Sequence, residues 1–225
     1  MRIVVLGKGK TGSLVAGLAR ERGHEVSALD EFENPHGAAL TAELVHSVDA
    51  FIDFTCADAA LENMRAILGA GGSIVVGTTG WYAHLDEMKA LAAANGGALL
   101  YGTNFSIGVM RLFKLTAELA KLDGYEFHIE ETHHTTKLDA PSGTAITLKQ
   151  VLEQAKPGIQ VGITSHRVGD AKGEHVVRAK GAADELDIRH NAHSRRGFAE
   201  GAVRAAEWVN HRRGAWEFRE IFDDL

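Results

Sequence analysis

Cysteine, proline and aromatic residues are scarce in this chain of 225 residues, which has one cysteine, three prolines and 7% aromatic residues. A single cysteine, Cys56, cannot form an internal disulfide or a thiolate metal cage, and it fits a reducing compartment. No stretch approaches the roughly 18 apolar residues of a membrane span, and the apolar run at the N-terminus is too short for a signal peptide. We therefore expect a cytoplasmic protein without a membrane partner.

Positive charge is also in deficit, because 30 acidic residues outnumber 24 basic ones and leave a net charge of −6. Such a chain has no general attraction for nucleic acid, and its few aromatic residues leave little for stacking on single strands. With 45% apolar and 24% charged residues, the composition is typical of a folded protein of one large or two small domains. No nucleic-acid partner is expected.

The first 104 residues alternate short β-rich apolar runs with helix-patterned stretches, which predicts a parallel sheet covered by helices. The expected strands are residues 3–6, 25–29, 50–54, 73–76 and 98–101, and the expected helices are 12–22, 57–68 and 86–95. This order is typical of a Rossmann-like domain. We predict a dinucleotide-binding domain over residues 1–104.

The pattern changes after residue 104. The expected elements are helices over 107–122 and from 141–144 to 156–158, and strands over 125–130, 161–167, 175–179 and 185–190. They predict a smaller α+β domain over residues 105–195, with an open, mostly antiparallel sheet. Residues 196–225 are expected to form a terminal helix and a tail. The fold class is therefore α/β with a second, smaller domain.

A glycine-rich loop, Gly7-Lys8-Gly9-Lys10-Thr11-Gly12, matches G-x-G-x-x-G between an expected strand and an expected helix. The glycines let the chain turn tightly and let its backbone approach a pyrophosphate at the positive end of the helix. Asp30 closes the second strand, where its carboxylate can accept hydrogen bonds from ribose hydroxyls and repel a 2′-phosphate. We expect NADH to be preferred and NADPH to be possible, because Lys8 and Lys10 offset part of that repulsion.

A second glycine-containing turn, Gly77-Thr78-Thr79-Gly80, ends a later strand at the carboxyl edge of the sheet, where ligands of such folds bind. Alternatively, this segment is an ordinary strand-to-helix turn. The corresponding alternative for the first loop is a glycine-rich turn that binds no ligand.

Seven of the twelve histidines lie in residues 105–195, and two of them open the most informative segment, residues 131–145. His133, His134 and Lys137 precede a helix start at Ser142-Gly143-Thr144, whose hydroxyls and free N–H groups suit a carboxylate. A histidine is also the natural proton donor near neutral pH. Adjacent histidines could bind zinc, but no fitting ligand spacing is present, so no metal is expected. Alternatively, Ser142 or Thr144 only caps the helix and the histidines are surface residues.

This segment closely resembles the signature of the dihydrodipicolinate reductase family, H-H-x-x-K-x-D-A-P-S-G-T-A, in residues His133 to Ala145. Further resemblance lies in the N-terminal glycine loop and in Phe54-Thr55, Gly77-Thr78-Thr79-Gly80, Asn104 to Val109, Gly173-Glu174-His175, Ser194-Arg195 and Phe198 to Ala202. The first loop departs from the family's usual G-x-x-G-[RK]-M-G, since it is one residue shorter and has Thr11 for the methionine.

The resemblance implies an NAD(P)H-dependent reductase of lysine and diaminopimelate biosynthesis that converts 4-hydroxy-tetrahydrodipicolinate, a small cyclic dicarboxylate, to tetrahydrodipicolinate. It implies that His133 is the general acid/base and that Lys137 is a second proton donor able to hold a carboxylate. It places substrate on His134, Ser142, Gly143 and Thr144. It places the cofactor on the glycine loop, Phe54, Gly77, Thr78, Thr79, Thr103, Asn104 and Phe105.

The resemblance also implies a homotetramer associating through the sheet of the second domain, and a C-terminal helix that returns to the first domain. Two alternatives stay open. One is another Rossmann amino-acid dehydrogenase, such as one acting on aspartate. The other is a non-catalytic NAD(H)-binding redox sensor, which would bind cofactor without turnover.

Overall fold

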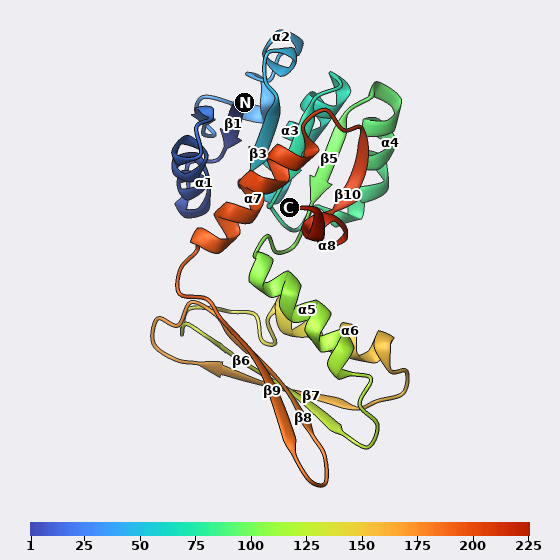
Figure 1. The fold of residues 1–225 in the computed structure, drawn as a ribbon. Coiled ribbons are helices and arrows are strands. Elements are labelled where there is room, and N and C mark those ends of the chain that lie inside the picture. The colour runs from blue at the N-terminus through green and yellow to red at the C-terminus, as the bar shows by residue number, and fades with distance from the viewer. The chain divides into compact units, whose positions relative to one another are not determined.

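The computed structural model describes all 225 residues, and the chain divides into two compact units (Figure 1). The first unit comprises Met1–Ser106 and Arg196–Leu225, and the second comprises Ile107–Arg195. Residues from both ends of the chain therefore build one unit, with the middle of the chain inserted as the other.

A six-stranded sheet, entirely parallel, organises the first unit in the order β10-β5-β4-β3-β1-β2. Its strands are β1 (Arg2–Leu6), β2 (Glu25–Leu29), β3 (Ala50–Asp53), β4 (Ser73–Val76), β5 (Ala98–Tyr101) and β10 (Gly214–Glu217). The first five confirm the expected Rossmann-like pattern. The sixth, β10, lies in the segment expected to be a tail and pairs with the edge of β5.

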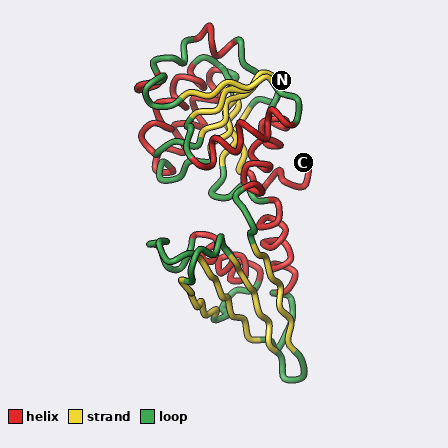
Figure 2. The backbone as a smooth tube through the Cα atoms, turned by 90° about the vertical axis from the view of Figure 1, so that its left-hand side faces the viewer, coloured by secondary structure: helices red, strands yellow, loops and turns green.

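Helices lie on both faces of this sheet (Figure 2), which explains why every residue of β3, β4 and β5 is buried. α1 packs on α7, and α3 packs on α4. The helices are α1 (Lys10–Glu21), α2 (Ala42–His46), α3 (Ala57–Gly69), α4 (Leu85–Asn95), α7 (Arg196–Val209) and α8 (Phe218–Ile221), with single 3-10 turns at Pro35–Gly37, Tyr82–His84 and Phe222–Asp224.

The second unit has a mixed four-stranded sheet in the order β7-β6-β8-β9. Its elements are α5 (Ile107–Leu119), β6 (Glu126–His133), α6 (Gly143–Ala155), β7 (Val161–Arg167), β8 (Glu174–Lys180) and β9 (Glu185–Asn191). β6 pairs antiparallel with β8, and β8 with β9, whereas β6 and β7 are parallel because α6 crosses over between them. The sheet is thus mostly antiparallel, as expected.

The two helices α5 and α6 pack on each other and share one apolar core with this sheet. Phe127 and Ile129 of β6 contribute to this core together with Leu148 and Leu152 of α6. Because side chains alternate along a strand, every second residue of β6 from Phe127 points into the protein.

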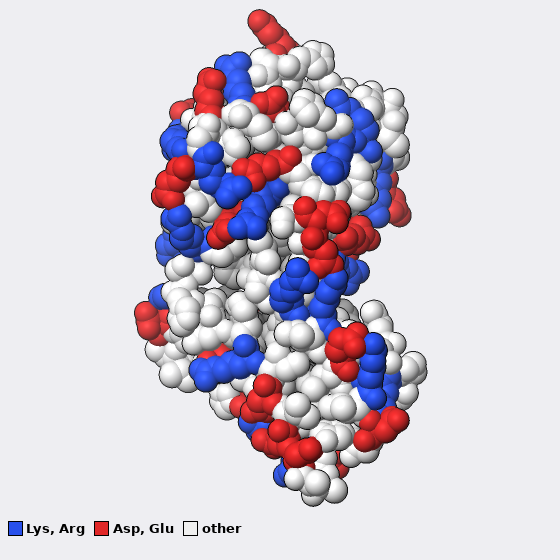
Figure 3. Space-filling model, viewed as in Figure 1, with Lys and Arg blue, Asp and Glu red and all other residues white.

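None of the helices combines the length and the apolar character needed to cross a bilayer. Acidic and basic side chains are interspersed on the face drawn in Figure 3, with neither sign forming one continuous field.

Candidate active site

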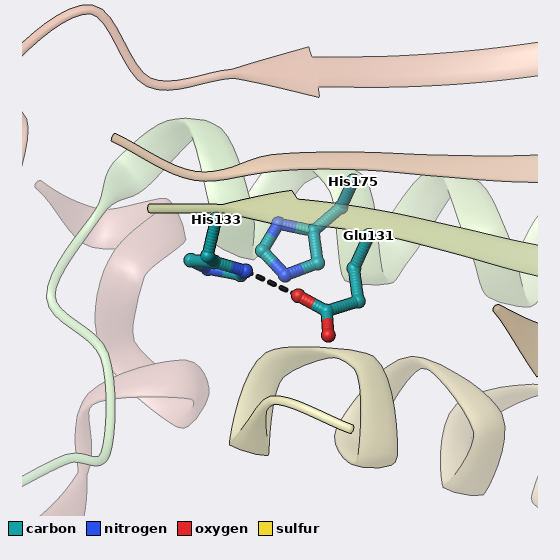
Figure 4. Close-up of side chains that lie close together, drawn as sticks. All are labelled: Glu131, His133 and His175. Atoms are coloured by element: carbon teal, nitrogen blue, oxygen red, sulfur yellow. Dashed lines mark hydrogen bonds and ion pairs between the residues drawn. The ribbon is translucent and has the colours of Figure 1, made fainter. Parts of the chain in front are cut away.

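A buried carboxylate and an imidazole meet at the carboxyl end of β6. Glu131 is fully buried, and its Oε2 forms a hydrogen bond with Nδ1 of His133, whose side chain is 12% exposed (Figure 4). On the neighbouring strand β7, the Arg167 guanidinium donates to Oε1 of Glu131 at 2.9 Å. Both oxygens of the buried carboxylate therefore have cationic or N–H partners within the protein.

The ring of His175, on β8, lies edge-on to His133 with 5.1 Å between the ring centroids (Figure 4). His175 is buried, and its Nε2 lies 3.1 Å from the Ser142 hydroxyl. That hydroxyl also accepts the Ala145 N–H and so caps α6. Ser142 thus links the histidine cluster to the start of the helix that follows the signature segment.

Burial shapes the protonation of this cluster. It lowers the pKa of His175 to about 4, so this ring is neutral near pH 7. Burial also lowers the pKa of His133, although the Glu131 carboxylate opposes that effect. Glu131 itself stays ionised: burial raises its pKa, but hydrogen bonds from Ser165, Arg167 and His133 outweigh burial and leave the pKa lowered.

Lys137 lies in the loop between β6 and α6, where its Nζ contacts both oxygens of Asp139 at 2.7 and 2.9 Å. Its side chain is 22% exposed, whereas that of Asp139 is 59% exposed. His134 is half-buried and lies 2.8 Å from the Thr136 hydroxyl through its Nδ1. Ser142 is buried. A Cβ on the neighbouring Gly143 would meet no atom within 4 Å, so the space beside this residue is open.

The second unit therefore contains all the residues predicted for the chemistry and for substrate binding: His133, His134, Lys137, Ser142, Gly143 and Thr144. Sequence reasoning assigned no role to Glu131, Arg167 or His175. Two of them carried a signal: Glu131 is in phase with the buried Phe127 and Ile129, and His175 is in phase with the buried Val177 and Ala179. A polar residue in a buried register is a candidate for function.

Three possible metal ligands also coincide here, since atoms of Glu131, His133 and His175 all lie within 4.8 Å of one another. The Arg167 guanidinium contacts the same carboxylate. This positive charge compensates Glu131 without an ion.

In the first unit, the glycine loop turns from β1 into α1 and depends on two of its glycines for packing. Gly7 has φ +95°, and a Cβ there would lie 2.4 Å from the Phe54 carbonyl oxygen. A Cβ on Gly12 would lie 1.9 Å from the Gly7 carbonyl oxygen. These contacts leave no room for a side chain, which matches the tight turn and the close helix packing expected of this loop.

Gly9 differs from both, because a Cβ there would meet no atom within 4 Å. Gly9 is also the N-cap of α1, and no side chain caps the first N–H groups of that helix. Open space above uncapped N–H groups suits an anion that approaches the backbone closely. The loop therefore fits a dinucleotide pyrophosphate.

Asp30 follows β2 beside this loop. Its Oδ1 accepts the N–H groups of Phe32 and Glu33, and its Oδ2 lies 3.7 Å from the Lys8 ammonium. Lys8 also pairs with Glu33. Two carboxylates and one ammonium thus meet where the adenosine ribose is expected.

A buried carboxylate that was not predicted from the sequence forms a hydrogen bond with the turn after β4. Asp53 is fully buried at the end of β3 and accepts hydrogen bonds from the hydroxyls of Thr78 (2.7 Å) and Thr55 (2.8 Å) and from Asn63 (2.8 Å). The Thr78 hydroxyl also accepts the Thr55 N–H. Thr78 is therefore buried and engaged within the protein, whereas Thr79 is exposed at the carboxyl edge of the sheet.

Two aromatic rings, those of Phe54 and Phe105, pack beside this turn. The Phe54 ring packs over Gly77, where a Cβ would lie 2.2 Å from the ring, and its edge faces Phe105 at 6.3 Å between centroids. Asn104 accepts the Ser106 N–H, and Thr103 is exposed. The residues predicted for the cofactor therefore all lie in the first unit, in the loops that follow β1 to β5 and in the first turn of α1.

Two family models match the chain: the dihydrodipicolinate reductase N-terminus over residues 1–105 and the C-terminus over residues 108–222. A 4-hydroxy-tetrahydrodipicolinate reductase of Natronomonas pharaonis is 36% identical, covering 96% of this chain and 97% of the relative. One of Christiangramia forsetii is 34% identical, covering 100% and 99%.

Among solved structures, a dipicolinate-bound dihydrodipicolinate reductase from Paenisporosarcina sp. TG-14 superimposes with a TM-score of 0.82 at 21% identity, covering 100% of this chain and 99% of that one. An aspartate dehydrogenase from Thermotoga maritima reaches a TM-score of 0.51 at 13% identity, which is a likeness of fold alone. The aspartate alternative is therefore not favoured. The chain belongs to the dihydrodipicolinate reductase family, and with it to the oxidoreductases of lysine and diaminopimelate biosynthesis.

Proposed function

We propose that this chain reduces 4-hydroxy-tetrahydrodipicolinate to tetrahydrodipicolinate, with loss of water, using NADH in preference to NADPH. The observation that carries the proposal is the buried pairing of Glu131 with His133, next to Lys137 and the N-terminus of α6, in a chain of this family. A reduced nicotinamide, when bound, supplies the hydride. The residues of the chain supply protons, anchors for two carboxylates and a cradle for the cofactor.

His133 is the proton donor of this proposal. Hydride addition to the conjugated ring, after water has left the 4-hydroxy form, leaves an electron pair along the enamine that takes up one proton. Nδ1 of His133 is held by Glu131, which leaves Nε2 to deliver that proton. The carboxylate of Glu131 favours the protonated ring that this step consumes.

Lys137 and the start of α6 are the two anchors of the dicarboxylate. The Lys137 ammonium contacts only the exposed carboxylate of Asp139, which a substrate carboxylate can replace. At the other anchor, Gly143 begins α6 with open space around it, so a carboxylate can approach the backbone N–H groups of the first turn, while the buried Ser142 hydroxyl caps the helix. We extend the proposal to a homotetramer in the cytoplasm, on the resemblance to the family.

Replacing Lys137 by alanine is expected to raise the KM for the dicarboxylate by about 10- to 100-fold, because a charge-assisted hydrogen bond is worth about 1.5–3 kcal/mol. Lys137→Arg, which keeps the charge, should recover part of the loss. Steady-state kinetics of both variants test this. An equal fall of kcat and kcat/KM in Lys137→Ala would instead make the lysine a proton donor.

Replacing Asp30 by alanine is expected to move cofactor preference towards NADPH by about tenfold, because it removes one negative charge that would repel a 2′-phosphate and leaves Lys8 with one carboxylate partner, Glu33, instead of two. The ratio of kcat/KM for the two cofactors measures this, with Glu31→Ala as the neighbouring control. A wild-type enzyme that strongly prefers NADPH would show that Asp30 does not repel the 2′-phosphate.

The function itself is tested by following NADH absorbance while dihydrodipicolinate synthase generates the substrate in the same cuvette. We expect oxidation that depends on this chain and on the synthase. Binding of NADH without oxidation would refute the reductase proposal and favour the redox sensor instead.

A further inference from the structure

We propose that Arg167 and Glu131 form a positioning pair that sets both proton-handling residues, His133 through its ring and Lys137 through its loop. The inference rests on the proposed function. Neither member of the pair is assigned contact with substrate, and both lie in the second unit with the residues they position.

The first half of the pair fixes the tautomer of His133. An ionised carboxylate has only acceptors, so Nδ1 of His133 must carry the hydrogen that bonds to Glu131. Nε2 is therefore the nitrogen that exchanges protons. It faces Gly173, where a Cβ would lie 3.1 Å away, and this glycine keeps the space beside Nε2 open.

The second member of the pair, Arg167, neutralises the Glu131 carboxylate and also fixes the backbone of the loop that carries Lys137. Arg167 donates to Glu131 at 2.9 Å and also to the backbone carbonyls of Asp139 at 2.6 Å and Lys137 at 3.3 Å. One planar guanidinium thus joins the buried carboxylate to the loop that carries Lys137. A lysine in its place would supply the charge but not this set of fixed directions.

The groups that face His133 explain why the pair affects its proton. Glu131 on β6 favours the imidazolium, whereas Arg167 on β7 and Lys137 in the loop disfavour it. His175 on β8 is neutral near pH 7, so it adds no positive charge. Glu131 is thus the one carboxylate that compensates the protonated ring.

Glu131→Gln tests the first half, with Glu130→Gln as the matched control, since Glu130 directly precedes Glu131 in β6, has a side chain that is 38% exposed and pairs with Arg178. We expect kcat of Glu131→Gln to fall about 100-fold with KM within threefold, because an orienting partner is lost. The decline of rate with rising pH should begin at lower pH, because the imidazolium loses its carboxylate. Glu130→Gln should match the wild type.

Nitrogen-15 NMR of the histidine rings gives a readout that needs no turnover. In the wild type, the neutral His133 ring should carry its proton on Nδ1, and in Glu131→Gln this preference should be lost. A wild-type ring protonated on Nε2 would overturn the inference even if the enzyme is inactive. Conversely, an active wild type with unchanged kinetics and pH profile in Glu131→Gln would overturn it while leaving the proposed function intact.

Arg167→Lys tests the second half through a double-mutant cycle with Lys137→Ala. If Arg167 holds the loop for Lys137, the Lys137→Ala change should cost at least threefold less in kcat/KM in the Arg167→Lys background than in the wild type. Strictly multiplicative effects would show that Arg167 does not act through Lys137 and would overturn this half.

Discussion

Replacing His133 by glutamine is expected to lower kcat by about 100- to 10,000-fold, which is the usual contribution of a positioned general acid. Glutamine is similar in size and can still donate an N–H group to Glu131, but it has no proton to give at neutral pH. Because Arg167 remains paired with Glu131, the buried carboxylate is not left without a partner. The loss should therefore appear in turnover and not in folding.

The control for this variant is His166→Gln, which changes an exposed histidine on β7 and should leave kcat within twofold of the wild type. Thermal unfolding should give both variants a Tm near that of the wild type. A His133→Gln enzyme that retains most of its turnover would remove His133 from the chemistry.

The pH dependence follows from the same residue. The protonated ring is the donor, so the rate is present below the pKa of His133 and lost as pH rises through it. Burial lowers that pKa, so we expect the alkaline decline of kcat to lie at lower pH than for an ordinary histidine. It should be absent from His133→Gln.

Replacing Gly12 by alanine is expected to destabilise the protein by on the order of 3 kcal/mol, because the new Cβ would lie 1.9 Å from the Gly7 carbonyl oxygen. The backbone atom it meets belongs to the turn after β1, so relief requires α1 to move away from the sheet. Thermal unfolding should show a Tm lower by about 6–12 °C.

Gly9→Ala, in the same loop, separates packing from binding. Gly9 has φ −70° and no neighbour within 4 Å of its Cβ position, so alanine should leave Tm unchanged. If the pyrophosphate lies against this backbone, the new methyl group should weaken NADH binding by about tenfold or more, as measured by fluorescence titration. Unchanged binding would place the pyrophosphate elsewhere.

Regular patterns made most of the fold predictable from sequence. The four inner strands of the first unit, β1, β3, β4 and β5, are mostly apolar runs. The last long helix was predicted from apolar residues on one helical face: Phe198, Ala202, Ala205, Ala206 and Val209. The strand β10 was missed because only two of its four residues, Ala215 and Trp216, have apolar side chains. Its extended conformation depends on pairing with β5. Tertiary pairing of this kind leaves no local signal.

The candidate site was predictable where chemistry is concentrated in one segment, as it is from His133 to Thr144. Its supporting residues come from three strands, because Glu131, Arg167 and His175 meet only when β6, β7 and β8 pair. The registers that join Glu131 to His175 and His133 to Arg167 are set by the sheet. Sequence spacing alone could not place these side chains together.

The most direct measurement follows deuterium into the product from NADH that carries deuterium at both C4 positions, with substrate generated in situ and the product analysed by mass spectrometry. We predict one deuterium in each tetrahydrodipicolinate, formed in equal amount to the NADH oxidised. Oxidation of NADH without transfer of the label to the ring would contradict this prediction.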